Sequence, residues 1–211
     1  MTSYFPKHIS FATEALDVQP DAINLWVGNE STVSSMHKDH YENVFCVASG
    51  QKIFTICPPA DAIFIDENLF PSGTFRNDDD SGWIVDVQKE CNDDGDGKLE
   101  LVRWIEADVD KMMMDDQPSE SRLDYLAKFP QVQYAHPMKV KVEAGDMLYL
   151  PALWYHKVTQ TCETVAINYW YDMRFDSPSW CYFNFLQHLN TAQNPNDEAD
   201  SDDKNNQLIV R

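Results

Sequence analysis

Two histidines and one aspartate are the side chains of this sequence best suited to hold a metal. The segment His37-Lys38-Asp39 supplies a histidine and a carboxylate two residues apart, and His156 follows much later in LPALWYHKV. Two histidines and a carboxylate can occupy one face of a ferrous ion and leave its other positions open for a co-substrate and oxygen. These three residues therefore predict a non-haem iron site.

The spacing of His37 and Asp39 is consistent with a β-strand. Residues i and i+2 of a strand point to the same face, so both ligands would point inward and Lys38 away. Continued along the strand, the alternation places three further side chains inside, namely Tyr41, Asn43 and Phe45. The same alternation turns His40 outward and predicts that it is not a ligand.

Two other histidines compete with His156 for the third ligand position. His136 precedes a proline and is expected in an extended connection. His188 is expected in a helix outside the strands. His156 follows a turn and a short strand at 145–151, and antiparallel pairing can bring it beside the strand of His37. The sequence therefore favours His156.

The remaining pattern is one of many short strands. Apolar or alternating runs between turn signals predict strands at 22–27, 37–47, 52–57, 138–142, 147–150, 154–159 and 165–171. A hydroxyl followed by proline at Ser177-Pro178 predicts the start of an amphipathic helix over 178–190. Many strands and little helix favour an all-β sandwich or barrel, a class whose jelly rolls include the cupins.

The length of 211 residues suits one domain. We expect an irregular N-terminal segment at 1–20, a cupin-like domain at 21–191 and an acidic, flexible tail at 192–211. An acidic insertion at about 76–125 is expected to interrupt the domain, with short helices near 108–114 and 121–128.

Composition restricts the partners and the compartment. The net charge of −19 argues against nucleic-acid binding, which needs Lys and Arg against phosphates. It favours a basic, Lys-containing protein or peptide, although solubility explains an acidic surface equally well. The sequence contains no apolar run of about 18 residues, so we expect no membrane span. Five scattered cysteines without a C-x-x-C pair and the absence of a secretory signal predict a cytoplasmic or nuclear protein.

Three strings carry a family resemblance. HKDHYENVFCVASGQKIFTICPP, GDMLYLPALWYHKV and INYWYDM resemble the JmjC-domain oxygenases of the cupin superfamily. They resemble in particular a subgroup of (3S)-lysyl hydroxylases that act on GTP-binding proteins and have also been described as histone-tail endopeptidases. Members of that subgroup carry a longer N-terminal region, so we expect a domain N-terminally shortened relative to them, with an open sheet edge on that side.

The resemblance implies a double-stranded β-helix that binds Fe(II) and the co-substrate 2-oxoglutarate. It implies that His37, Asp39 and His156 ligate the iron. Lys52 would bind the distal carboxylate of 2-oxoglutarate, which would explain a lysine in an apolar strand, since a buried cation is costly unless paired. An exposed Lys52 on an edge strand is the alternative. The other co-substrate contacts that the resemblance implies are Ser34, Asn43 and Asn168.

The activity implied is hydroxylation of a lysyl side chain. Three alternatives stay open: a catalytically impaired cupin that acts as a binding module, an endopeptidase acting on basic tails, and a JmjC demethylase. Two roles stay open for the C-terminal helix, packing on the barrel or forming a dimer interface, and the resemblance favours a homodimer.

Overall fold

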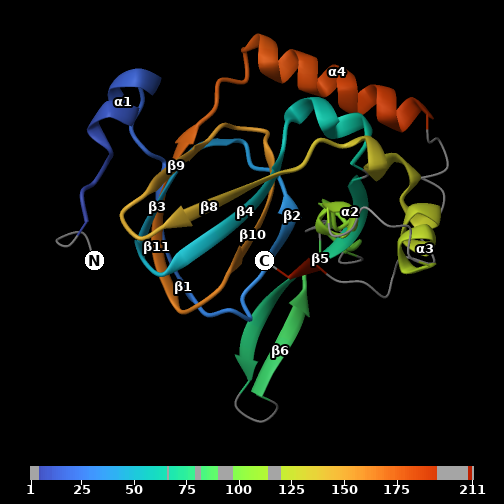
Figure 1. Ribbon diagram of the computed structural model, residues 1–211, viewed down its shortest axis with the longest axis horizontal. Helices are drawn as coiled ribbons and strands as arrows, with labels where there is room; N and C mark the ends of the chain where they lie inside the picture. The colour runs from blue at the N-terminus through green and yellow to red at the C-terminus, as the bar shows by residue number, and fades with distance from the viewer. Residues whose placement is uncertain are drawn as a thin grey trace.

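Two antiparallel four-stranded sheets form the body of the protein (Figure 1). The computed structural model describes residues 5–65, 67–78, 82–89, 97–113, 120–193 and 209–210. The first sheet has the order β1 (Ala22–Gly28), β11 (Thr164–Asp172), β3 (Tyr41–Ser49) and β9 (Met147–Leu150). The second has the order β2 (Ser34–His37), β10 (Tyr155–Gln160), β4 (Gln51–Cys57) and β8 (Met138–Glu143). Most paired strands are distant in sequence, as they are in a double-stranded β-helix. The predicted fold class is therefore confirmed.

Both sheets bury apolar side chains in the space between them. Phe45 of β3 and Phe54 of β4 meet edge to face, with ring centroids 5.1 Å apart. Gly50, with φ +79°, forms the corner between these strands, and a Cβ there would lie 2.4 Å from a backbone oxygen of Glu163. The buried members of this core are Phe45, Val47, Phe54, Ile56, Val142, Leu150, Val158 and Ala166. Burying each large apolar side chain stabilises the fold by about 1.5–3 kcal/mol.

The prediction of a single strand from His37 to Val47 is wrong. β2 ends at His37 and β3 begins at Tyr41. β2 pairs with β10 in the second sheet, whereas β3 pairs with β11 in the first. A chain that changes sheets must leave one hydrogen-bonded ladder before it enters the next, so residues 38–40 belong to no strand.

The N-terminal segment, expected to be irregular, contains the helix α1 (Ser10–Leu16). The helix buries Ala12 against outward-facing side chains of β3 and β11, which include Val44, Ile167, Tyr169 and Tyr171. These side chains face away from the barrel interior and need a cover. Local sequence pattern does not predict this cover, because it depends on which face of the sheet lies inside.

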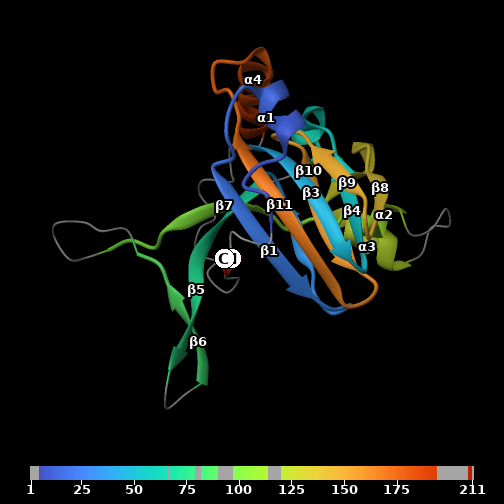
Figure 2. The same ribbon diagram turned by 90° about the vertical axis from the view of Figure 1, so that its left-hand side faces the viewer.

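The acidic insertion begins earlier than predicted and contains strands. The hairpin of β5 (Glu67–Asp78) and β6 (Gly82–Val87) extends away from the barrel (Figure 2). The first part of β5 pairs instead with β7 (Leu101–Ile105). The two predicted short helices are present as α2 (Asp110–Met113) and α3 (Glu120–Lys128). The 3-10 helices η1 (Pro59–Ile63) and η2 (Pro130–Tyr134) lie at the two ends of this region.

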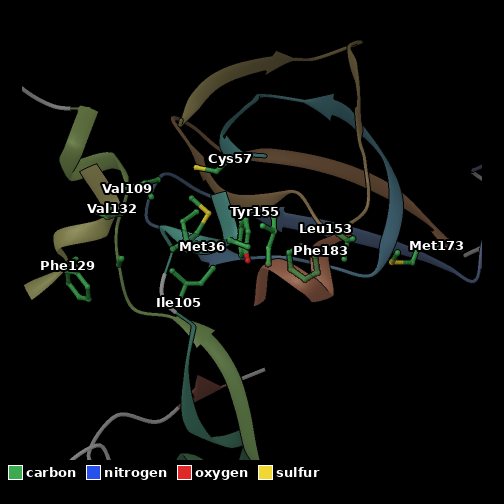
Figure 3. Close-up of a cluster of buried hydrophobic side chains, with 14 residues drawn as sticks. Met36, Cys57, Ile105, Val109, Phe129, Val132, Leu153, Tyr155, Met173 and Phe183 are labelled. Atoms are coloured by element: carbon green, nitrogen blue, oxygen red, sulfur yellow. The ribbon is translucent and has the colours of Figure 1, made fainter. Parts of the chain in front are cut away.

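The predicted C-terminal helix is present as α4 (Pro178–Gln193) and lies across one end of the barrel (Figure 1). The hydroxyl of Ser177 accepts a hydrogen bond from the backbone N–H of Trp180 at 3.2 Å, which caps the helix as expected. Phe183 points from the helix into a cluster with Tyr155 and Leu153 (Figure 3). Most of the predicted tail at 192–211 lies outside the described residues, apart from the end of α4 and β12 (Ile209–Val210), which pairs in parallel with β5.

No helix in the described part of the chain is long and apolar enough to cross a membrane. Within the same part the cysteines are free thiols, at positions Cys46, Cys57, Cys162 and Cys181.

Candidate metal centre

The structure brings His37, Asp39 and His156 together. One ligand atom from each lies within 4.8 Å of the others. The Nε2 atoms of His37 and His156 lie 3.9 Å and 3.7 Å from Oδ2 of Asp39. These separations leave room for one ion at the centre of the triangle.

Pairing between β2 and β10 positions the two histidines. His37 and His156 are register partners, so their side chains project side by side from the sheet. Asp39 lies beyond the end of β2, and its backbone carbonyl accepts a hydrogen bond of 2.9 Å from the N–H of Leu153. The ladder therefore places two ligands, and a loop-to-loop contact places the third.

Both histidine rings are held by their Nδ1 atoms. Nδ1 of His37 lies 2.7 Å from the carbonyl oxygen of Ser35, and Nδ1 of His156 lies 3.0 Å from that of Trp154. A carbonyl oxygen only accepts, so each Nδ1 must carry the proton and each Nε2 presents a lone pair to the centre. This is the tautomer that a metal requires.

Burial keeps His156 neutral. The pKa of His156 falls from 6.5 to about 3, mainly because burial disfavours the imidazolium and also because His37 lies beside it. A neutral imidazole is the ligating form. Two imidazoles and a carboxylate on one side of an ion fit Fe(II) with open positions.

The other histidines lie elsewhere. The ring of His40 packs against Phe175 and Trp180, with centroid distances of 5.9 Å and 5.4 Å. Nδ1 of His136 lies 2.8 Å from Oδ1 of Asp61. His188 contacts a backbone carbonyl within α4. The preference for His156 over these histidines agrees with the geometry.

A cavity of about 100 Å³ adjoins the three ligands. Lys52 lines it and is 5% exposed, and burial lowers the pKa of its ammonium group. In the described ranges no carboxylate lies within ion-pair distance of this lysine. β4 is an interior strand between β10 and β8, which excludes the edge-strand alternative for Lys52. A buried ammonium without an anionic partner fits the carboxylate of a ligand.

The remaining predicted residues also line the cavity. The indole N–H of Trp26 donates to Oδ1 of Asn168 at 3.0 Å, and the amide of Asn168 donates to Oδ1 of Asn43 at 3.2 Å. Ser34, the first residue of β2, lines the cavity as well. Apolar walls complete it, contributed by Phe45, Phe54 and Val158. All seven predicted site residues therefore surround one space.

A second, outer cavity of about 580 Å³ shares His37 and Asp39 with the first. Trp104 of β7 lies in its wall and stacks on His37, with ring centroids 5.5 Å apart and an interplanar angle of 2°. The indole N–H of Trp104 also donates to Oγ of Ser35 at 3.0 Å. Sequence reasoning missed Trp104, because no spacing relates the acidic insertion to His37.

Comparisons with known proteins agree with this geometry. A family model described as a cupin-like domain matches residues 3–177. The human bifunctional peptidase and (3S)-lysyl hydroxylase JMJD7 is 39% identical over 186 residues, which cover 88% of this chain and 52% of that protein. The chain belongs to the cupin-like family of JmjC-domain proteins.

Two further JmjC relatives match the same region. JmjC domain-containing protein E of Dictyostelium discoideum is 38% identical over 192 residues, covering 88% of this chain and 52% of that protein. Lysine-specific demethylase JMJ32 of Arabidopsis thaliana is 37% identical over 187 residues, covering 86% and 50%. The chain thus spans about half the length of the curated relatives it matches. The resemblance read from the three sequence strings is confirmed.

Proposed function

We propose that this JmjC protein is an Fe(II)- and 2-oxoglutarate-dependent oxygenase that hydroxylates a lysyl side chain of another protein, with a GTP-binding protein as the expected substrate class. The observation that carries the proposal is the position of Lys52. A buried ammonium group that pairs with no carboxylate in the described part of the chain lines the same small cavity as His37, Asp39 and His156.

The cavity suits a ligand with a carboxylate at each end. His156 is the register partner of Ile56, four residues along β4 from Lys52, so the metal-ligating side chains and the ammonium group line separate parts of the cavity. When bound, the iron and 2-oxoglutarate supply oxidative decarboxylation to succinate and carbon dioxide, coupled to hydroxylation of a substrate C–H bond.

The side chains of the protein bind and orient the reactants. His37 and His156 present Nε2 lone pairs because their Nδ1 protons are held by backbone carbonyls. The amide chain from Trp26 through Asn168 holds Asn43 at the cavity wall, where it can orient the co-substrate. The apolar walls exclude water from the reacting atoms.

The outer cavity gives a substrate side chain access to the ligated face. It shares His37 and Asp39 with the inner cavity, so a side chain entering it would come beside the residues that would hold the metal. The names of two relatives refer to lysine chemistry. The net charge of −19 favours a basic partner through long-range attraction. These two observations support a lysine-bearing polypeptide as substrate. The free cysteine thiols support a cytoplasmic or nuclear location.

Coupled turnover tests the proposal. The full chain, Fe(II), 2-oxoglutarate and a Lys-containing protein should yield succinate together with substrate that has gained one oxygen atom. His37→Ala should abolish both products. Binding of metal and 2-oxoglutarate without product on any basic substrate would instead identify a binding module. Peptide cleavage that persists without 2-oxoglutarate would identify the peptidase named in the human relative.

A further inference from the structure

Lys38, the residue between two of the metal-ligating side chains, is partly buried and ion-paired. Its ammonium nitrogen lies 2.6 Å from Oε1 of Glu67, the first residue of β5. The side chains of Lys38 and Glu67 are only 13% and 8% exposed. An ion pair removed from water in this way is more than a surface contact, because breaking it leaves a lone buried charge.

The carboxylate of Glu67 is fully engaged by its surroundings. The hydroxyl of Tyr155 donates to Oε1 at 2.9 Å, and the amide of Gln187 on α4 donates to Oε2 at 3.3 Å. The ammonium group of Lys38 also lies 5.7 Å and 5.4 Å from the ring centres of Tyr155 and Phe183. Figure 3 shows these two rings in the cluster between the barrel and α4. Lys38 therefore contacts three separate elements, namely β5, β10 and α4.

The backbone that carries His37 and Asp39 needs such an anchor. β2 is an edge strand with a register shift in its pairing to β10, and residues 38–40 lie outside any strand. His156 differs, because β10 pairs with β4 along its whole length. The weakly constrained part of the metal site is thus the part on which Lys38 lies.

We infer that the Lys38–Glu67 ion pair is a positioning device that holds His37 and Asp39 in ligating geometry. The side chain of Lys38 reaches Glu67, whereas those of its neighbours His37 and Asp39 meet His156, so the side chains of these three consecutive residues point to opposite sides. Fixing Lys38 against β5 and α4 therefore turns its two neighbours toward the metal. This inference rests on the proposed iron site and adds the residues that shape it.

Binding of Mn(II) alone to the full chain tests the inference without turnover. The free Mn(II) signal in electron paramagnetic resonance reports the affinity, and circular dichroism confirms that each variant is folded. We expect Lys38→Met to bind Mn(II) about tenfold more weakly, the loss seen when residues behind metal ligands are removed. Lys38→Arg keeps the charge and should retain most of the affinity.

A double-mutant cycle separates positioning from stability. Glu67→Gln and Lys38→Met each leave one buried charge alone, whereas the double variant leaves neither. The double variant should therefore recover stability relative to the single variants. Its Mn(II) affinity should stay about tenfold low, because every variant of the cycle lacks the same anchor. If Lys38→Met does not fold, the double variant supplies the measurement.

Lys157→Met is the matched control. Lys157 also lies beside a metal-ligating residue and is 14% exposed, with its ammonium nitrogen 2.8 Å from Asp108 and 2.9 Å from Asp110. It lies within β10, whose pairing to β4 fixes the backbone. Its loss should lower stability and leave Mn(II) affinity unchanged.

The outcomes are distinct. Native-like Mn(II) affinity in folded Lys38→Met, or an equal loss in Lys157→Met, would overturn the positioning role. Failure of the native chain to bind Mn(II) would overturn the proposed function itself, and the positioning role with it.

Discussion

His37 and His156 face each other as register partners of the antiparallel strands β2 and β10, with ring centroids 4.2 Å apart. The ladder between these strands therefore determines the distance between two of the three metal-ligating groups. Asp39 completes the triangle from outside the ladder, with Oδ2 within 4 Å of both Nε2 atoms.

Removing either histidine of the pair should abolish metal binding. His156→Ala leaves one imidazole and one carboxylate, too few for a stable site. The measurement is calorimetric titration of the native chain and the variant with Mn(II). His40→Ala is the control, because its exposed ring packs against Phe175 and Trp180 outside the triangle. A large loss of affinity in His40→Ala would contradict the ligand assignment.

Lys52→Met should separate co-substrate binding from metal binding. The variant removes the cation that we assign to the distal carboxylate, so 2-oxoglutarate should bind about 10–100-fold more weakly. Mn(II) affinity should stay the same, because Lys52 contacts no ligand of the triangle. The ligand-free variant should be as stable as the native chain or more stable, since the native lysine is buried and none of the described carboxylates pairs with it. Unchanged 2-oxoglutarate affinity would remove Lys52 from the site.

The metal-free protein should lose stability as the pH falls below about 6.5. The folded pKa of His156 is about 3, mainly through burial, so the unfolded chain takes up a proton that the folded chain does not. The stability that neutral His156 contributes is fully present above its unfolded pKa of 6.5 and is lost as the pH falls toward 3. Its slope is at most about 1.4 kcal/mol per pH unit. Urea unfolding at pH 7, 6 and 5 measures it, and an unaltered slope in His156→Gln would contradict it.

Asp110 should hold the insertion against the second sheet. Its carboxylate accepts from Lys157 at 2.9 Å, Lys139 at 3.0 Å and the hydroxyl of Thr55 at 2.9 Å. Asp110→Ala should lower the free energy of unfolding by about 2–3 kcal/mol, because half-buried donors lose their acceptor. Chemical denaturation measures the loss. Asp176→Ala, which breaks the exposed pair with Arg174, should change stability little.

We propose that α4 mediates a homodimer. Its outer face exposes Tyr182, Phe185 and Leu189, which recur at helical spacing along the helix. Phe185→Glu places a charge on this face and should convert the dimer to a monomer. Light scattering after size exclusion measures the mass, which should fall from twice 24.3 kDa to the monomer value. A monomeric native chain would contradict the proposal.

The sequence by itself determined the fold class and the identity of the candidate site residues. Strand alternation has a period of two and is a local property, so the spacing of Asn43 and Phe45 puts both on the same face of their strand. The family resemblance points to Lys52, and the cost of a lysine in an apolar strand without a partner supports that assignment. The short strands and the capped C-terminal helix follow from turn and cap residues that act within a few positions.

Only the tertiary structure decided how the site is held. Strand alternation does not apply across residues 38–40, since the chain changes sheets there, and the inward direction of Asp39 is held by contacts outside any strand. The anchor of Lys38 is Glu67, 29 residues away, and the ring stacked on His37 is Trp104 from the insertion. Such pairs carry no periodic signal, because their proximity results from the packing of β5, β7 and α4 around the barrel. The ligands can be read from local pattern, whereas their support depends on contacts between distant segments.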